Sequence, residues 1–89
     1  NSDNINRNPI TIEDFNNLNT EIYNNIKKKL DEQNIVTNET CSICLENFNE
    51  NDNILESKCN GVHLFHTNCI KPWLLNMSKS CPICREDII

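Results

Sequence analysis

The sequence is poor in the residues from which a small protein usually builds its core. Only 37% of its 89 residues are hydrophobic, 6% are aromatic, and there is a single glycine. A chain of this length buries a small fraction of its surface when it folds, so we expect it to need a staple such as a disulfide or a metal ion. The sequence therefore predicts one small, cross-linked domain with an extension.

Long apolar runs and strong positive charge are also missing. No apolar stretch approaches the ~20 residues that span a membrane, and no secretory signal is present. The net charge is −5, and the longest basic run, Lys27-Lys28-Lys29, is interpreted as the last turn of a helix. We therefore expect no membrane span in this segment and no nucleic-acid partner. The chain begins with Asn rather than Met, so we expect it to be part of a longer protein, whose other regions could include a membrane tether.

All the cysteines and histidines of the chain fall between residues 41 and 84. In order they are Cys41, Cys44, Cys59, His63, His66, Cys69, Cys81 and Cys84. Six cysteines could form a disulfide framework, as in small secreted proteins. The two C-x-x-C pairs, however, have the spacing of zinc knuckles, and the histidines fall in register with the cysteines. We therefore expect metal-bound thiols and a reducing compartment, cytoplasmic or nuclear.

These eight side chains are enough for two complete zinc sites. Zinc prefers four thiolate or imidazole ligands in a tetrahedron, and four closely spaced pairs supply two such sets with nothing left over. Spacing alone allows two pairings: consecutive pairs share a zinc, or the first pair joins the third and the second joins the fourth. We expect two structural zinc ions in either case.

The first part of the chain predicts a disordered lead over residues 1–10 and a helical extension with its connection over residues 11–37. Thr11 and Asp14 have the spacing of a helix-capping box, so we expect a helix from Ile12 to Leu30. Its apolar residues lie on one face at about 100° per residue. That face either packs on the neighbouring domain or meets a partner, which could be a second copy of the chain.

Several short motifs accompany the ligands in residues 38–89. They are Cys44-Leu45-Glu46-Asn47-Phe48, His63-Leu64-Phe65-His66, Cys69-Ile70-Lys71-Pro72-Trp73-Leu74 and Cys81-Pro82-Ile83-Cys84-Arg85. With the ligand order, they resemble the RING finger in its two-histidine variant over about residues 40–88. The related PHD finger usually has cysteine where His63 stands, which favours the RING resemblance. Three residues separate Cys59 from His63 where many RING fingers have one, and we expect Gly61 to give that loop its conformational freedom.

The resemblance implies a cross-braced fold. One zinc would be held by Cys41, Cys44, His66 and Cys69, and the other by Cys59, His63, Cys81 and Cys84. We expect a small zinc-stabilised α+β domain in which Ile54-Leu55 and Leu64-Phe65 form a short β-hairpin. A single central helix would run from Asn68 to about Met77. Phe48, Leu55 and Phe65 would supply its core.

The resemblance also implies a function, that of a ubiquitin ligase. Zinc sites closed by four protein ligands leave no position for a catalytic water, and no free thiol remains as a nucleophile. RING fingers act instead by binding a ubiquitin-conjugating enzyme charged with ubiquitin and promoting transfer to a substrate lysine. We expect the substrate to be recruited by regions outside this chain. The alternatives are an interaction scaffold without ligase activity and, more remotely, a finger that binds histone tails or lipids.

Individual residues match the family's functional positions. Ile43, Trp73 and Pro82 correspond to the apolar surface that contacts the conjugating enzyme, which Leu45, Leu74 and Leu75 could extend. Arg85 corresponds to the residue that bridges ubiquitin and the conjugating enzyme. The plainer interpretations are that Ile43 packs on a neighbour, that Trp73 belongs to the core, and that Arg85 is a solvated charge beside Glu86 and Asp87.

Overall fold

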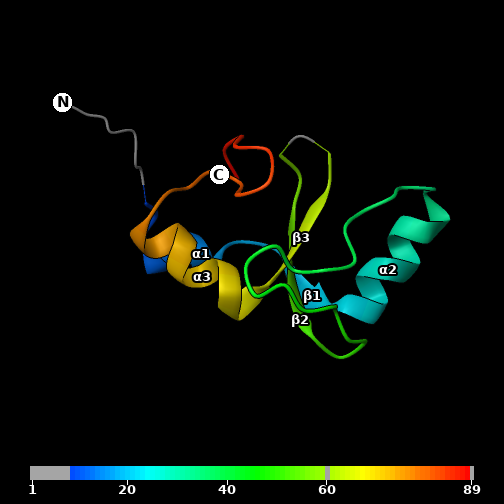
Figure 1. Ribbon diagram of the computed structural model, residues 1–89. Coiled ribbons are helices and arrows are strands. Elements are labelled where there is room, and N and C mark those ends of the chain that lie inside the picture. The colour runs from blue at the N-terminus through cyan, green and yellow to red at the C-terminus, as the bar shows by residue number, and fades with distance from the viewer. Residues whose placement is uncertain (1–8, 60, 89) are drawn as a thin grey trace.

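The computed structural model describes residues 9–59 and 61–88. The elements in chain order are α1 (Ile12–Asn16), β1 (Thr20–Ile22), α2 (Tyr23–Glu32), β2 (Asn53–Ser57), β3 (His63–His66) and α3 (Thr67–Asn76). The strands form one antiparallel sheet in the order β1-β2-β3. The sheet lies in the middle of the molecule, with α1 and α3 toward one end and α2 toward the other (Figure 1).

The two faces of the β2–β3 hairpin bury different halves of the core. Leu55 lies opposite Phe65 in the ladder, and both belong to an apolar cluster with residues of α1 and α3. Ile54 and Leu64 point the other way, as successive residues of a strand must, and join a second cluster with Phe48 and residues of α2. None of the four strand side chains is more than 1% exposed. The predicted hairpin and the predicted core residues are confirmed.

The predicted continuous helix from Ile12 to Leu30 is wrong. The helix begins as expected, because Thr11 and Asp14 form the capping box, but α1 ends at Asn16 and Asn17 is its C-cap. Asparagine is unfavourable in helix interiors and favours turns. Four of the six residues before Glu21 are polar, so a helix that continued through them would bury little apolar surface. The chain instead forms β1, whose backbone pairs with β2. Hydrogen bonds offered by the edge of β2 thus outweigh the helical pattern.

The second helix starts on a loop rather than on a side-chain cap. Ile22 occupies its N-cap position and offers no side-chain acceptor. The backbone N–H of Tyr23 donates to the carbonyl of Asp52 at 2.9 Å, and that of Asn24 donates to the carbonyl of Glu50 at 3.0 Å. Because the first N–H groups of a helix have no partner within it, these bonds fasten α2 to the loop that precedes β2.

The apolar face of the extension packs on the chain's own domain. Phe15 on α1 and Ile26 and Leu30 on α2 are buried, whereas Ile12 and Ile22 are 49% and 40% exposed. Phe15 belongs to the cluster on the α3 side of the sheet, and the two α2 residues belong to the other. The extension therefore contributes to both halves of the core.

Part of the segment predicted to be a disordered lead belongs to the folded core. Ile10, which falls within the predicted lead, is only 9% exposed, and its N–H donates to the carbonyl of Leu74 at 2.8 Å. Ile10 is therefore part of the core, because α3 holds its backbone and the apolar cluster covers its side chain. The rest of the predicted lead, residues 1–8, lies outside the described residues.

The remaining helix, α3, runs from Thr67 to Asn76, within one residue of the predicted bounds. The indole N–H of Trp73 donates to the carbonyl of Ser80 at 2.7 Å, which ties the end of α3 to the last C-x-x-C segment. Among the described residues, no helix combines the length and apolar character needed to cross a membrane.

Candidate metal centres and contact surface

The first cluster of ligands joins the first C-x-x-C segment to the start of α3. Its members are Cys41, Cys44, His66 and Cys69, and one side-chain donor atom from each lies within 4.8 Å of all the others. The sulfur of Cys44 is 3.3 Å from Nδ1 of His66. His66 ends β3 and Cys69 lies in the first turn of α3, so a single site connects three parts of the chain.

The second cluster joins the β2–β3 hairpin to the last C-x-x-C segment. Its members are Cys59, His63, Cys81 and Cys84, again with all four donor atoms within 4.8 Å. Nδ1 of His63 is 3.5 Å from the sulfurs of both Cys59 and Cys81, and the sulfurs of Cys59 and Cys84 are 3.2 Å apart. The predicted pairing of first with third and second with fourth is confirmed.

The donor atoms of both clusters fit zinc. Tetrahedral bonds of 2.0–2.3 Å place neighbouring ligand atoms about 3.5 to 3.8 Å apart, and the separations within the clusters are close to this. Each cluster offers three thiolates and one imidazole, which is a common set for structural zinc, and four protein ligands leave no position for substrate or water. The two zinc ions are structural: when bound, each supplies a cross-link between distant segments.

A carboxylate outside the first cluster orients its histidine. Nε2 of His66 lies 2.8 Å from Oδ2 of Asp52, so an Nε2–H bond to the carboxylate leaves Nδ1 free for the metal. The backbone N–H of Asn49 donates to the same oxygen at 2.9 Å, and these two bonds hold the pKa of Asp52 below its ordinary value. A carboxylate behind a zinc-bound imidazole fixes its tautomer and strengthens it as a ligand. Sequence reasoning missed this role of Asp52.

The thiols need a cation in order to ionise together. Without the charge of a metal ion to offset it, burial and then the neighbouring cysteines raise the pKa of Cys69, and burial does the same for Cys81. At Cys41 burial opposes ionisation, but hydrogen bonds from neighbouring backbone groups outweigh it and lower the pKa. Crowded thiolates repel one another until a divalent ion binds, so zinc binding releases protons and stabilises the fold in the same step.

A comparison with protein-family models supports this interpretation of the two zinc sites. The model described as "Ring finger domain" matches residues 39–85, which is more than half of the chain. The chain belongs to the RING finger family. Its ligand order and its paired zinc sites make it a RING finger of the two-histidine type.

The similarity to named proteins covers the RING finger and only a small share of each relative's length. The Rattus norvegicus protein named E3 ubiquitin-protein ligase RNF181 is 46% identical over 48 residues, which cover 54% of this chain and 27% of the relative. The Homo sapiens protein named E3 ubiquitin-protein ligase RNF149 is 45% identical over 51 residues, covering 57% of this chain and 12% of the relative. The chain thus matches only a minor part of each relative.

A solved structure resembles nearly the whole of the described fold. The crystal structure of the RING-H2 domain of Arabidopsis RMR1 aligns with a TM-score of 0.70 and 28% sequence identity. The alignment covers 90% of this chain and 96% of that chain, which is more than the part matched by the family model. The resemblance therefore extends into the segment that precedes the first zinc ligand.

The two C-x-x-C knuckles of the RING finger repeat one backbone geometry. In the first, the N–H of Cys41 donates to the carbonyl of Glu46 and the N–H of Leu45 donates to the carbonyl of Cys41; Cys81, Glu86 and Arg85 make the same pair of bonds in the second. Leu45 and Arg85 both have positive φ, 66° and 70°. The two residues therefore occupy equivalent left-handed positions, where non-glycine side chains are uncommon.

The loop between the ligands Cys59 and His63 contains the RING finger's one glycine. Gly61 has φ of +87°, a conformation that glycine adopts without steric cost, and a side chain placed there would meet nothing within 4 Å. The predicted conformational role of Gly61 is confirmed: its backbone dihedral rather than lack of space calls for glycine.

The residues predicted to contact a conjugating enzyme differ in exposure. Ile43 and Leu45 are 40% and 76% exposed, while Trp73 and Pro82 are half-buried. Leu74 is fully buried in the core on the α3 side of the sheet. Its inclusion in a contact surface is therefore wrong, because no part of its side chain reaches solvent.

One exposed apolar residue was missed. Ile83 is 41% exposed and takes the place in the second knuckle that Ile43 takes in the first. The repeat of Cys-x-Ile-Cys in the sequence could have identified it. Ile83 therefore joins the candidate contact residues of this RING finger.

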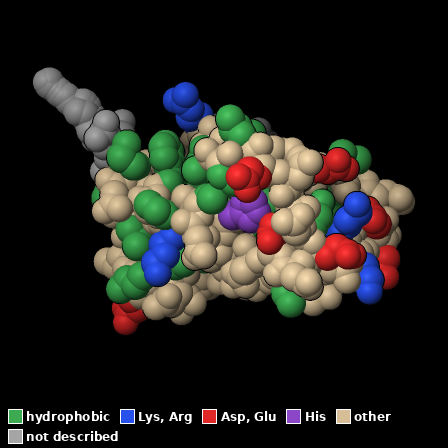
Figure 2. Space-filling model, turned by 60° about the horizontal axis from the view of Figure 1, so that its bottom comes forward, with side chains coloured by type: hydrophobic (Ala, Val, Ile, Leu, Met, Phe, Trp, Pro, Cys, Tyr) green, Lys and Arg blue, Asp and Glu red, His purple; other side chains and the backbone are tan. Residues whose placement is uncertain are grey.

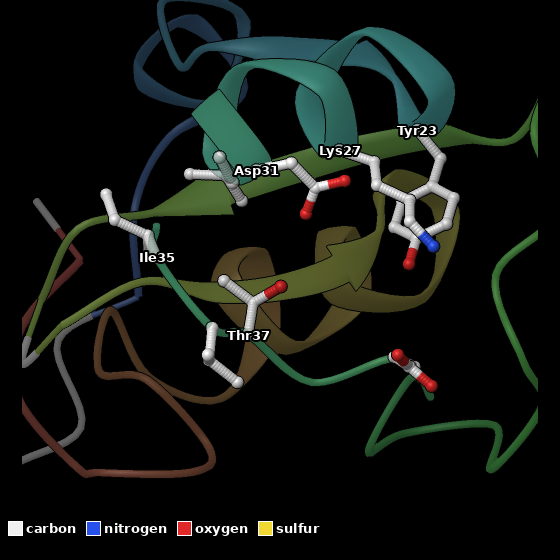
Figure 3. Close-up of a pocket in the computed structure, with 8 residues that line it drawn as sticks. Tyr23, Lys27, Asp31, Ile35 and Thr37 are labelled. Atoms are coloured by element: carbon white, nitrogen blue, oxygen red, sulfur yellow. The ribbon is translucent and has the colours of Figure 1, made fainter. Parts of the chain in front are cut away.

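Other surface features lie away from the zinc ligands. On the face seen in Figure 2, Lys and Arg side chains are scattered, and acidic side chains lie among them at the end where α2 is found. A hollow of about 190 Å³ lies between α2 and the connection that follows it. Tyr23, Lys27 and Asp31 line it from the helix, and Ile35 and Thr37 line it from the connection (Figure 3). None of the eight zinc ligands contributes to it.

Proposed function

We propose that this RING finger is the catalytic module of a ubiquitin ligase. It would bind a ubiquitin-conjugating enzyme charged with ubiquitin and promote transfer to a substrate lysine, without a covalent intermediate of its own. The observation that carries the proposal is the pair of closed zinc sites that hold exposed Ile43 and Ile83 on matching knuckles. Relatives named as E3 ubiquitin-protein ligases support it. Regions outside the chain would select the substrate.

The contact surface for the conjugating enzyme would be formed by both knuckles and the end of α3. Exposed apolar side chains clustered on a small, polar domain are typical of a protein-binding site. Ile43 and Leu45 would contribute from the first knuckle and Pro82 and Ile83 from the second. Trp73 would lie between them, since its N–H already donates to Ser80 and its half-buried ring retains an exposed part.

Arg85 would orient the ubiquitin. Its side chain is exposed, and among the described residues it makes no ion pair with Glu86 or Asp87. The carboxylate Oδ2 of Asp87 lies instead 3.6 Å from Nζ of Lys79. A guanidinium has several donors in a rigid plane and can bond two partners at once. Held between ubiquitin and the conjugating enzyme, it would keep the thioester in a reactive arrangement, a gain in orientation.

Two substitutions separate binding from activation. Ile43→Ala is expected to abolish detectable binding of a cognate conjugating enzyme, because it removes a central apolar contact. Arg85→Ala is expected to leave that affinity within about threefold while slowing discharge of ubiquitin at least about tenfold, since orientation contributes to rate rather than to binding. Calorimetry with a panel of conjugating enzymes and single-turnover discharge to lysine measure the two effects.

The controls identify the failure of each part. Ile12→Ala, on the exposed side of α1, should match the unchanged protein in both assays. Absence of zinc-dependent ubiquitin discharge with every conjugating enzyme would favour an interaction scaffold and reject ligase activity. Loss of binding in Arg85→Ala would show that its assigned role is wrong.

A further inference from the structure

The segment that enters the first knuckle has one partly buried apolar side chain, Ile35, which packs against the α2 side of the core, and it is otherwise polar or exposed. After α2 ends, the N–H of Ile35 donates to the carbonyl of Leu30 at 2.9 Å, which closes the helix. The next residues then pass the hollow beside α2 (Figure 3), and Val36 is 93% exposed. Apolar contacts with α2 therefore do not by themselves fix where this connection delivers the chain to Cys41.

The side chain of Asn38 attaches this segment to β3. Nδ2 of Asn38 donates to the carbonyl of Leu64 at 2.8 Å, and Oδ1 of Asn38 accepts the N–H of Leu64 at 2.9 Å. Nδ2 also donates to the carbonyl of Thr40 at 2.9 Å. The two bonds with Leu64 reproduce the exchange of N–H and C=O that a neighbouring strand would make. The amide thus acts as one residue of an extra strand along the outer edge of β3.

The three bonds connect parts of both zinc sites. Leu64 lies in β3 between His63, a ligand of the second zinc, and His66, a ligand of the first. Thr40 directly precedes Cys41 and is paired through its backbone with Asn47 on the far side of the knuckle. The Asn38 amide is therefore a direct link, independent of the metal, between the first knuckle and the strand that leads into α3.

The chemistry of the link requires a primary amide of this length. A carboxylate can accept the N–H of Leu64 but has no donor for the two carbonyl oxygens, whereas an amide supplies one acceptor and two N–H groups. Leu64 is fully buried, so water has poor access to its backbone groups. An unpaired buried donor or acceptor is costly, and Asn38 is the group that satisfies these.

We propose that Asn38 is a positioning residue of the contact surface, which it serves by holding the knuckle that carries Ile43 in register with β3 and with the helix that carries Trp73. This inference rests on the proposed function, since the surface matters through the conjugating enzyme that it binds. Asn38 is not one of the eight zinc ligands. Its effect is on the relative placement of Ile43 and Trp73, which would contact the conjugating enzyme.

The test is Asn38→Asp, which keeps the size of the side chain and places a carboxylate against the carbonyls of Thr40 and Leu64. The matched control is Asn19→Asp, the same change at an exposed position whose side chain makes no hydrogen bond within the described residues. Both variants of the 89-residue chain are loaded with zinc, checked for two ions per chain, and compared at a temperature where NMR spectra show them folded. The measured quantity is affinity for a conjugating enzyme that binds the unchanged chain.

We expect Asn38→Asp to bind about tenfold more weakly, as for the loss of one buried hydrogen-bonded link, with two zinc ions retained. Amide signals of Cys41 to Leu45 should shift in this variant and not in the control. Unchanged affinity in a folded variant would overturn the positioning role, as would loss of a zinc ion, which would assign Asn38 to metal retention. Absence of binding by the unchanged chain would instead reject the proposed function.

Discussion

Asp52 shows how much a single side chain outside the ligand set contributes to a zinc site. Its carboxylate accepts from His66 and from the backbone of Asn49, and its own carbonyl accepts the first N–H of α2. One residue therefore orients a metal ligand and fastens a helix. The zinc site and the extension are coupled through it.

Substitution of Asp52 by asparagine is expected to weaken the first zinc site about 10- to 100-fold, the usual effect of changing a residue that supports a zinc ligand. The amide retains an acceptor oxygen but loses the charge that strengthens the imidazole. Competition with a chromophoric chelator should show one of the two zinc ions released more readily.

Asp31→Asn is the control for this experiment. Asp31 lies exposed on α2 and is not a member of either ligand cluster, so the same chemical change there should leave both zinc affinities as they were. Equal weakening in the two variants would mean that net charge, not support of His66, governs zinc affinity.

At the scale of elements, the extension is part of the folded unit. Phe15 on α1 packs in the same cluster as Leu55 and Phe65, and Lys71 of α3 lies over its ring at 5.6 Å. The edge of β2 pairs with β1. The family match begins at residue 39, but among the described residues the core already includes Ile10.

Removing the Phe15 ring should therefore lower the free energy of unfolding as much as removing a buried side chain of the RING finger itself. We expect Phe15→Ala to lower the free energy of unfolding by about 3 to 5 kcal/mol, the range for deletion of a buried aromatic side chain. Denaturant unfolding with zinc in excess measures it. Ile12→Ala on the same helix, at a half-exposed position, should cost less than about 1 kcal/mol. Equal effects would show that α1 is not anchored in the core.

Sequence patterns predicted the parts of the fold that depend on short spacing. The ligands, the hairpin, the capping box of α1 and the bounds of α3 could all be found, and family resemblance resolved the pairing that spacing left open. The helix over Ile12 to Leu30 was wrong because a strand of three residues, Thr20–Ile22, is too short to leave a periodic signal. Its formation depends on the distant edge of β2.

The same limit applies to the site. Asn38 bonds to a residue 26 positions away and Asp52 to one 14 positions away, and neither belongs to a motif. Their importance follows from which backbone groups the fold leaves without partners. The burial of Leu74 likewise depends on the packing of α3 against the sheet, which periodicity over a short helix does not determine.

For the whole molecule, the two zinc ions replace the large core that the composition cannot provide. The first joins the chain around residue 41 to the start of α3, and the second joins the tip of the hairpin to the segment around residue 81. Each apolar cluster contains a cysteine ligand, Cys81 in one and Cys41 in the other. Metal binding and core packing are therefore one cooperative event.

Removal of zinc is expected to unfold the chain. An excess of chelator should abolish the dispersed NMR spectrum and most of the ellipticity, and addition of zinc under reducing conditions should restore both. A reductant without chelator should leave the structure intact, because the thiols are bound to metal and not to each other. If the chain remains folded when metal analysis shows less than about one zinc per ten chains, the fold does not depend on zinc and this account is wrong.

The intrinsic fluorescence of the aromatic residues near the two zinc sites can also report the loss of each metal ion. The chain has one tryptophan and one tyrosine. Trp73 is hydrogen-bonded beside the second knuckle, whereas Tyr23 packs on Phe48, whose ring meets His66 of the first site. The emission of the two fluorophores should therefore change separately as each metal leaves, so that the order in which the two halves open can be followed without a label.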